Sequence, residues 1–143
     1  MWIGTRGQME EELVPRAGLR LETIRGGPIV GVPARTMLVN SARLTWSMQK
    51  AARLMGRFRP QVLFMTGGYV NVPVALVARA RRVPATIYLP DVEPGRAIRF
   101  LSRFADRVAC TAEASRAFFP GKKVVVTGYP VRPELLAARS LSP

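Results

Sequence analysis

The sequence predicts an α/β protein built as a Rossmann-like parallel sheet with helices on both faces. Short apolar runs rich in β-branched residues alternate with segments of helical periodicity along the 143 residues. Most of these runs end in turn residues, which is typical of buried parallel strands. The chain has the length of one domain, and its 48% hydrophobic residues are too many for a disordered chain. Alternating strands and helices imply right-handed crossovers between parallel strands.

The first half of the chain contains two predicted strands and two predicted helices. The strand Trp2–Thr5 leads to a helix over Gln8–Val14 and then to a strand over Leu19–Ile24. Residues 26–33 are expected to form a loop, because glycine and proline interrupt both periodicities there. A long helix is expected over Arg35–Phe58, where apolar residues recur at helical steps.

The second half repeats the alternation. A strand over Val62–Thr66 precedes a helix over Val72–Arg82, for which Asn71 is a suitable N-cap and Pro73 suits the first turn. The remaining predicted elements are a strand at Ala85–Leu89, a helix at Pro94–Phe104, a strand at Val108–Thr111, a helix at Glu113–Phe119 and a strand at Val124–Thr127. We expect one domain over residues 1–130 and the start of a linker over residues 131–143.

The charge of the chain is strongly positive and unevenly distributed. The formal net charge is +13, from 22 Lys and Arg residues against 9 Asp and Glu residues. No acidic residue lies between Glu22 and Asp91, whereas ten of the basic residues lie in that stretch. Such a concentrated positive field predicts an anionic partner, which could be nucleic acid, a membrane surface or phosphate groups.

Residue counts exclude several classes of site. With no histidine and one cysteine, the chain cannot form a Cys/His zinc site, a Ser-His-Asp triad or an internal disulfide, and we predict no metal site. Cys110 lies in an apolar strand and is predicted to pack in the core. The longest uncharged run, between Arg59 and Arg79, is interrupted by glycine and proline and is not expected to span a membrane. The N-terminus has no signal-peptide pattern. We expect a soluble chain or one attached to a membrane surface.

A ligand is expected at the carboxyl ends of the predicted strands. Three loops follow these ends, and they begin at Thr66, Pro90 and Thr127. In the first loop, Gly67 and Gly68 let the backbone approach a ligand, and the following helix N-terminus offers N–H groups to phosphate oxygens. A tight strand-to-helix turn that binds nothing would explain the same two glycines.

The long predicted helix has two distinct faces. Its apolar face carries Met37, Leu44, Met48, Ala51, Met55 and Phe58. The opposite face carries Val39, Trp46 and five basic residues, which are Arg35, Arg43, Lys50, Arg53 and Arg57. An indole among cations suits a membrane interface with anionic headgroups. An ordinary solvated face, with the Trp46 ring packed on arginine stems, would have the same pattern.

The acidic residues of the predicted loops are Asp91 and Glu93. Either carboxylate could act as a general base for a sugar hydroxyl, and either could instead cap the helix that follows Pro94. Arg132 could hold a diphosphate through paired hydrogen bonds, or it could be a solvated residue of a tail.

Segments of the chain resemble MurG-type glycosyltransferases, in the order in which that family has them. The resembling segments are Trp2–Gly7, Leu13–Gly18, Arg57–Val62, Thr66–Val70, Phe104–Val108, Pro120–Gly128 and Pro130–Pro133. The resemblance implies one half of a fold of two Rossmann-like domains, known as GT-B. In that family the N-terminal domain takes the lipid acceptor and docks on the membrane, and the C-terminal domain binds the nucleotide sugar.

By this resemblance the chain is the acceptor-binding part of a bacterial hexosyltransferase of peptidoglycan synthesis. The family moves N-acetylglucosamine from UDP-N-acetylglucosamine to a polyprenyl-diphosphate-linked sugar, converting lipid I to lipid II at the cytoplasmic face of the membrane. Gly67, Gly68, Tyr69 and Asn71 then fall in the loop near the acceptor diphosphate, and Arg132 matches an arginine near the donor. The basic helix falls in the region that the family uses against the bilayer. The nucleotide sugar is a substrate, no cofactor is implied, and nucleic acid is not an expected partner.

The chain departs from the family pattern in one loop that bears on the chemistry. The family has His-Glu-Gln-Asn where this chain has Tyr88 to Asp91, so only Asp91 is chemically similar. In addition, Asn71 and Val72 replace a Ser-Gly pair, and Tyr129 replaces an asparagine. These differences leave a related polyprenyl-linked acceptor open as an alternative.

The family's first strand and its donor domain have no counterpart in these 143 residues. We therefore expect a gap in the sheet between the Trp2 strand and the Val62 strand, or direct pairing of the two. We interpret the chain as a fragment of a longer gene product, and the alternative is that a second chain supplies the missing pieces. We also expect the chain alone to be inactive, because transfer requires donor and acceptor held together. An alternative is a non-catalytic subunit that recruits a separate donor-binding chain to the membrane. Nucleic-acid binding is suggested only by the charge.

Overall fold

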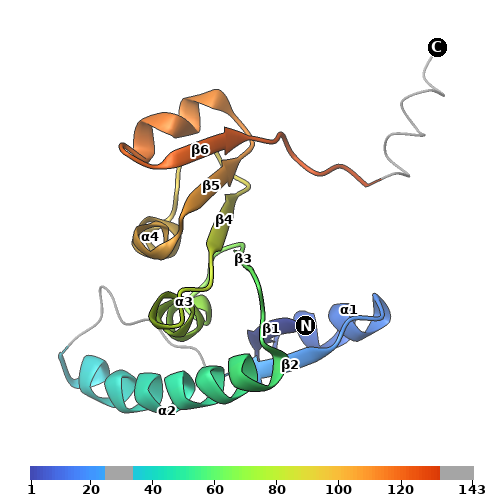
Figure 1. The fold of residues 1–143 in the computed structure, drawn as a ribbon, viewed down its shortest axis with the longest axis vertical. Coiled ribbons are helices and arrows are strands. Elements are labelled where there is room, and N and C mark those ends of the chain that lie inside the picture. The colour runs from blue at the N-terminus through green and yellow to red at the C-terminus, as the bar shows by residue number, and fades with distance from the viewer. Residues whose placement is uncertain (25–33, 133–143) are drawn as a thin grey trace.

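The computed structural model describes residues 1–24 and 34–132, and it describes side chains within the long helix from Leu44 onward. Its strands are all parallel and alternate with helices, which confirms the predicted α/β class (Figure 1). Within the described residues the strands form two sheets, with the orders β1-β2 and β3-β4-β5-β6. The predicted gap is therefore present, and the Trp2 and Val62 segments do not pair directly.

The two-stranded sheet has a helix on each face. β1 (Trp2–Thr5) pairs with β2 (Leu21–Ile24) in a register that sets Trp2 opposite Leu21. Gly4 points toward α1 (Glu10–Arg16), and a β-carbon on Gly4 would lie 3.3 Å from the Glu10 β-carbon. Ile24 points the other way and is buried beneath α2 (Ala34–Phe58). Because successive side chains of a strand point to opposite faces, the two helices pack on opposite faces of this sheet.

The four-stranded sheet packs its helices on one face. Its strands are β3 (Leu63–Met65), β4 (Ala85–Leu89), β5 (Arg107–Cys110) and β6 (Lys123–Val126). Met65, Ile87 and Val108 share a register row and are buried with α3 (Asn71–Ala80) and α4 (Arg96–Leu101). Cys110 is fully buried in the same cluster, as predicted. The opposite face carries Phe64 and Val125, whose side chains are 59% and 42% exposed.

The long helix joins the two sheets through a second core cluster. Ala51 and Met55 of α2 are buried against Val74 and Ala78 of α3 and against Ile24 of β2. The predicted apolar face is confirmed at these two α2 positions and at the partly buried Leu44 and Met48, while Met37 lies outside the described side chains. Phe58 differs from the prediction, because the last turn of α2 extends past α3 and leaves its ring 50% exposed. None of the described helices is both long and apolar enough to cross a bilayer.

Two of the predicted helices consist of or end in 3₁₀ structure, and two others, predicted over Gln8–Val14 and Val72–Arg82, are shifted by one or two residues to Glu10–Arg16 and Asn71–Ala80. The segment predicted as a helix over Glu113–Phe119 is a 3₁₀ helix, η2 (Glu113–Phe118). Its Ser115 side chain is fully buried and donates a hydrogen bond to the Val92 carbonyl at 2.8 Å, which pulls this short connection against the neighbouring loop. The segment predicted over Pro94–Phe104 begins two residues later as α4 and ends in a 3₁₀ turn, η1 (Ser102–Phe104).

Candidate functional site

The loops that follow β3, β4 and β6 lie at one edge of the molecule, because parallel strands have their carboxyl ends together. Two side-chain hydrogen bonds join β4 and its loop to neighbouring segments. The Tyr88 hydroxyl donates to the Gly128 carbonyl at 3.2 Å, and the Thr111 hydroxyl donates to the Pro90 carbonyl at 3.1 Å. These bonds join β4 and the loop that follows it to the loops after β5 and β6, and the loop after β3 lies at the same end of the sheet.

The loop after β3 depends on its two glycines. Gly67 and Gly68 have φ angles of 105° and 83°, which residues with a β-carbon rarely adopt. A β-carbon on Gly67 would lie 3.0 Å from Cγ1 of Ile98 in α4, whereas a β-carbon on Gly68 would meet nothing within 4 Å. Gly67 is thus closed in by α4, and the backbone at Gly68 is open to a ligand.

Asn71 acts differently from its predicted role. The N-cap of α3 is Val70, and Asn71 is the first residue of the helix, so the predicted cap was wrong. Its side-chain Nδ2 donates instead to the Gly67 carbonyl, four residues earlier. This bond closes the loop on itself, because it joins the start of α3 to the first of the two glycines.

Few N–H groups of the first turn of α3 are available to a ligand. The amides of Asn71 and Val72 donate to the carbonyls of Gly68 and Tyr69, both at 3.2 Å. Pro73 lies in the first turn, as predicted, and has no N–H group. A phosphate at this point would therefore meet the amides of Gly68 and of the half-buried Tyr69 rather than those of the helix.

The two acidic residues of the β4 loop have different partners. Glu93 forms an exposed ion pair with Arg99 at 2.8 Å, and Arg99 also donates from Nε to the Pro94 carbonyl. The N-cap of α4 is Gly95 and has no side-chain bond, so neither Asp91 nor Glu93 caps this helix, which contradicts the capping alternative. Asp91 is exposed and has no hydrogen bond or ion pair to any described residue. No group of three acidic or cysteine side chains that could hold a metal occurs in the described part of the chain.

Tyr88 is a feature of this edge that sequence reasoning treated only as a substitution. Its ring is half-buried and stacks on Phe64, with centroids 6.3 Å apart. Burial raises the pKa of the Tyr88 phenol, and the neighbouring Tyr129 and Cys110 raise it further. The phenol therefore stays protonated at neutral pH and serves as the hydrogen-bond donor to Gly128. The sequence feature that could have pointed to Tyr88 is an aromatic residue near the end of a buried strand.

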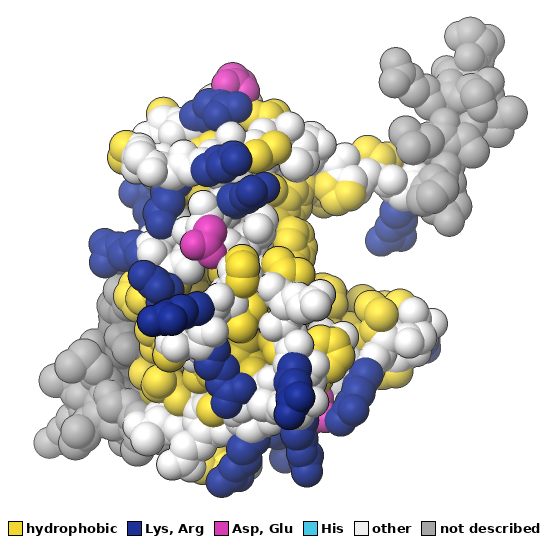
Figure 2. All heavy atoms as spheres, in the orientation of Figure 1, with side chains coloured by type: hydrophobic (Ala, Val, Ile, Leu, Met, Phe, Trp, Pro, Cys, Tyr) yellow, Lys and Arg dark blue, Asp and Glu magenta, His cyan; other side chains and the backbone are white. Residues whose placement is uncertain are grey.

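The basic face of α2 is a partly hollowed, cationic surface. Trp46 is 51% exposed, and the Lys50 ammonium lies 5.9 Å from the centroid of its ring. Arg53 and Arg57 are exposed beside them, and a pocket of about 290 Å³ includes all four residues together with Glu22. Blue side chains are visible along the lower edge of the molecule in Figure 2. Arg35 and Arg43 belong to the part of α2 whose side chains lie outside the described residues.

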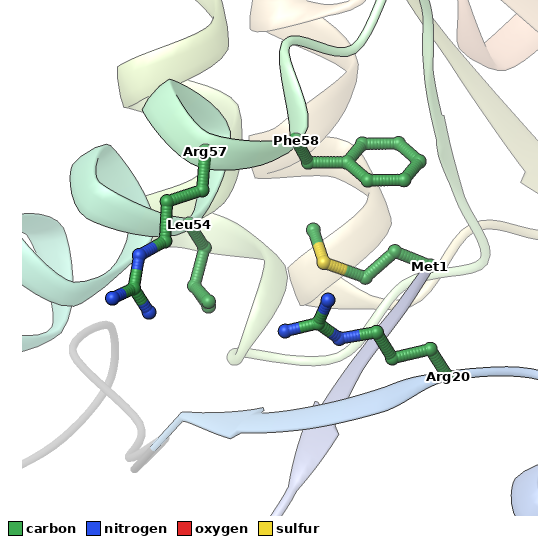
Figure 3. Close-up of a pocket in the computed structure, with 5 residues that line it drawn as sticks. All are labelled: Met1, Arg20, Leu54, Arg57 and Phe58. Carbon is green, nitrogen blue, oxygen red and sulfur yellow. The ribbon is translucent and has the colours of Figure 1, made fainter.

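A second pocket continues from this surface around the end of α2. Its volume is about 310 Å³, and its lining residues are Met1, Arg20, Leu54, Arg57 and Phe58. Figure 3 shows Arg20 reaching from the start of β2 toward Leu54 and Arg57. The Arg20 guanidinium also pairs with Glu22 at 2.9 Å. Sequence analysis did not select Arg20, because its distance from α2 along the chain gives no sign that the two meet.

Arg132 is not brought into the edge formed by the loops. It is exposed and lies in the segment that leaves β6 and runs away from the four-stranded sheet (Figure 1). We call the loop after β3, which contains Gly67 and Gly68, the glycine loop. No hydrogen bond or ion pair joins Arg132 to the glycine loop or to Asp91 among the described residues.

Comparisons with known proteins cover most of the chain. The family model described as the glycosyltransferase family 28 N-terminal domain matches residues 1–110. Two curated relatives are named UDP-N-acetylglucosamine--N-acetylmuramyl-(pentapeptide) pyrophosphoryl-undecaprenol N-acetylglucosamine transferase. The one from Pelobacter propionicus is 38% identical over 136 residues, and the one from Desulforudis audaxviator is 38% identical over 140 residues. These matches cover 95% and 97% of this chain but only 36% and 38% of the relatives, so the chain spans a little over a third of their length.

Two solved structures share the fold. The crystal structure of Acinetobacter baumannii MurG superimposes with a TM-score of 0.71 and 24% identity, over 93% of this chain and 37% of that one. The UDP-GlcNAc 2-epimerase of Neisseria meningitidis superimposes with a TM-score of 0.56 and 15% identity, over 97% of this chain and 48% of that one. Both likenesses confirm the Rossmann-like class predicted from the order of strands and helices.

Proposed function

The chain belongs to the glycosyltransferase family 28 N-terminal domain family, and on that premise we propose that it is the acceptor-binding part of a membrane-associated N-acetylglucosaminyltransferase. The complete enzyme would move N-acetylglucosamine from UDP-N-acetylglucosamine to a polyprenyl-diphosphate-linked sugar, which is the lipid I to lipid II step of peptidoglycan synthesis. The names of the curated relatives support this substrate pair. The observation that carries the proposal is the family match over residues 1–110.

The glycine loop is the proposed site for the acceptor diphosphate. The space in front of Gly68 is open, and the amides of Gly68 and Tyr69 are the donors nearest to it. Asn71 holds the loop in shape through its bond to Gly67. Successive backbone amides in such a loop can hold phosphate oxygens.

Asp91 is the proposed general base for the acceptor hydroxyl. A base must be free to accept a proton and must reach the reacting hydroxyl within hydrogen-bond distance. The Asp91 carboxylate is exposed and unpaired among the described residues, and it follows β4, the strand next to the glycine loop. Glu93 is the weaker candidate because Arg99 already pairs with it. Arg132 is proposed to lie near the donor in the complete enzyme.

The basic face of α2 is the proposed contact with the cytoplasmic face of the membrane. Lys50, Arg53 and Arg57 supply charge for anionic headgroups, and the exposed Trp46 ring suits the interface between headgroups and acyl chains. At 1.5 Å per residue, Trp46 lies roughly 16 Å along the helix from Arg57, so the contact would be an extended strip.

A chimeric enzyme tests the proposed function directly. This chain would replace the matched residues of the Pelobacter propionicus relative, so that the relative supplies every other part of the enzyme. We expect the chimera to transfer labelled N-acetylglucosamine from the UDP sugar to a polyprenyl-diphosphate-linked N-acetylmuramyl acceptor. Asp91→Asn should lower the turnover at least about 100-fold, whereas Glu93→Gln should leave most of it.

The role of the glycine loop in binding the acceptor is tested in the same chimera, with a control substitution at another glycine of positive φ. Gly68→Val should raise the KM for the lipid acceptor, because the side chain fills the space in front of the loop. Gly18→Val is the control, since Gly18 also has a positive φ and open space but follows α1 at the amino end of β2. A folded chimera that binds UDP-N-acetylglucosamine and transfers nothing to the acceptor would contradict the proposed function.

A further inference from the structure

The loop that carries Asp91 is held on both sides of that residue. The Thr111 hydroxyl donates to the Pro90 carbonyl at 3.1 Å, and the Ser115 hydroxyl donates to the Val92 carbonyl at 2.8 Å. These two carbonyls belong to the residues immediately before and after Asp91. The backbone on each side of Asp91 is therefore fixed by one side-chain hydroxyl, while its own carboxylate is exposed and has no partner among the described residues.

Both hydroxyls come from segments that are anchored in the core. Thr111 directly follows the fully buried Cys110 at the end of β5, and Ser115 is itself fully buried in η2. The two donors lie 21 and 23 residues along the chain from their acceptors, so these hydrogen bonds are not a local consequence of the turn. A fully buried hydroxyl requires a partner, which makes the bond from Ser115 a fixed part of the packing.

The remainder of the loop is held by α4. Arg99 pairs with Glu93 at 2.8 Å, and it donates from Nε to the Pro94 carbonyl at 3.1 Å. Four of the five residues over 90–94 therefore pair with, or accept a hydrogen bond from, a described side chain of another segment. Asp91 is the exception. The loop thus has a fixed backbone and leaves one carboxylate without a partner among the described residues.

We propose that Thr111 and Ser115 are positioning residues, which together form a hydroxyl clamp that orients the Asp91 carboxylate toward the acceptor hydroxyl. This inference rests on the proposed role of Asp91 as the general base. A base acts only within hydrogen-bond distance of the proton that it accepts, and a displacement of about 1 Å can lower a rate about 100-fold. Because the clamp holds the peptide groups on both sides of Asp91, the carboxylate moves only by rotation of its own side chain.

Nuclear magnetic relaxation of the backbone amides in the full chain tests whether the clamp holds the loop. Thr111→Val with Ser115→Ala removes both hydroxyls and changes the side-chain volumes little. The order parameters of the Asp91 and Val92 amides should be about 0.85 in the unmodified chain and fall below about 0.6 in this double variant. Values below about 0.6 in the unmodified chain, or no change in the double variant, would overturn the proposal.

Ser102→Ala is the matched control for the loss of a buried hydroxyl. Ser102 is buried, and its hydroxyl donates to the Arg99 carbonyl at 2.9 Å within its own turn rather than to the loop. Its substitution should leave the order parameter of Asp91 unchanged. A loss of order at Asp91 in Ser102→Ala equal to that in the double variant would contradict a specific clamp.

Kinetics of the chimeric enzyme described above test whether the clamp acts through the base. The double variant Thr111→Val with Ser115→Ala should lower kcat at least about tenfold and change the KM values for both substrates less than about twofold. Thr111→Ser with Ser115→Thr keeps both hydroxyls and should retain most of the turnover. A double variant with unchanged kcat would overturn the inference, provided that Asp91→Asn lowers the turnover as proposed.

Combining the clamp substitutions with Asp91→Asn separates positioning from a purely structural role. Without the carboxylate the clamp has no base to orient, so the same two substitutions should lower the remaining turnover by less than about twofold. An equal loss in both backgrounds would mean that the clamp only stabilises the fold, and it would overturn the proposal. If Asp91→Asn by itself left the turnover unchanged, the choice of base would be wrong and the clamp would orient no base, a result distinct from a failure of the clamp alone.

Discussion

Gly67 and Ile98 approach each other so closely that a β-carbon on Gly67 would lie 3.0 Å from Cγ1 of Ile98. The contact joins the loop after β3 to the buried face of α4 and so fixes one wall of the candidate site. The neighbouring Gly68 has the same kind of backbone conformation but open space in front of it. Substitutions at Gly68 therefore measure the cost of a positive φ alone, and substitutions at Gly67 measure that cost together with the cost of steric crowding.

Alanine substitutions should distinguish the two glycines by their stability. Gly68→Ala should lower the free energy of unfolding by about 1–2 kcal/mol, because it forces a side chain into a positive φ. Gly67→Ala should lower it by a further 1–3 kcal/mol or so, because the added methyl group also overpacks against Ile98. Urea denaturation followed by circular dichroism measures both values. Equal losses for the two variants would mean that α4 moves aside at no cost.

The bond from Asn71 to Gly67 should contribute measurably to the stability of the loop. Asn71→Ala removes the donor and leaves the Gly67 carbonyl without that partner, at a cost of about 1 kcal/mol. Gln61→Ala is the control, because Gln61 is exposed and should change the stability by less than about 0.5 kcal/mol. Thermal unfolding of the two variants and the unmodified chain provides the comparison. If Asn71→Ala left the stability unchanged, the hydrogen bond from Asn71 would not support a preformed loop.

The raised pKa of Tyr88 predicts a specific dependence of stability on pH. A phenol whose folded pKa is raised stabilises the protein below its unfolded pKa, near 10, and loses that contribution as the pH rises through the folded value. Tyr88→Phe should therefore be less stable than the unmodified chain at pH 8, and the difference should shrink above pH 10. Denaturant unfolding of both proteins from pH 8 to 11 measures it. A difference that stays constant over this range would contradict the role of the phenol as donor to Gly128.

Charge reversal on α2 should weaken the binding of the chain to anionic membranes. Arg53→Glu with Arg57→Glu should reduce binding to phosphatidylglycerol vesicles at least about tenfold, at roughly 1 kcal/mol for each basic residue near the surface. The binding of the unmodified chain should also weaken as salt screens the attraction.

Arg107→Glu with Lys123→Glu is the matched control for this vesicle experiment. Both residues are exposed and lie opposite each other on β5 and β6, far along the sheet from α2. The control changes the net charge by the same amount, so it should lose much less binding. Vesicle sedimentation compares the two double variants, and equal losses would mean that net charge alone drives the attachment.

Prediction from the sequence was most accurate where a pattern is local. The strand over Ala85–Leu89 was placed without error, and the long helix began one residue earlier than predicted. Prediction failed where a distant partner decides the local structure. Asparagine is a preferred residue type at the N-cap, but the Asn71 side chain donates to the Gly67 carbonyl instead. Glu93 was a candidate cap for α4, but its carboxylate pairs with Arg99 within that helix instead.

By itself the sequence determined the parallel α/β order, the two faces of the long helix and the glycine loop at the end of a strand, because periodicity and turn residues are properties of neighbouring residues. Only the tertiary structure decided that Gly67 is closed in while Gly68 is open, that Arg20 meets the end of α2, and that β1 and β3 face each other across an apolar groove. These relationships join segments far apart in the chain, and the packing of α2 against α3 sets the distance between them.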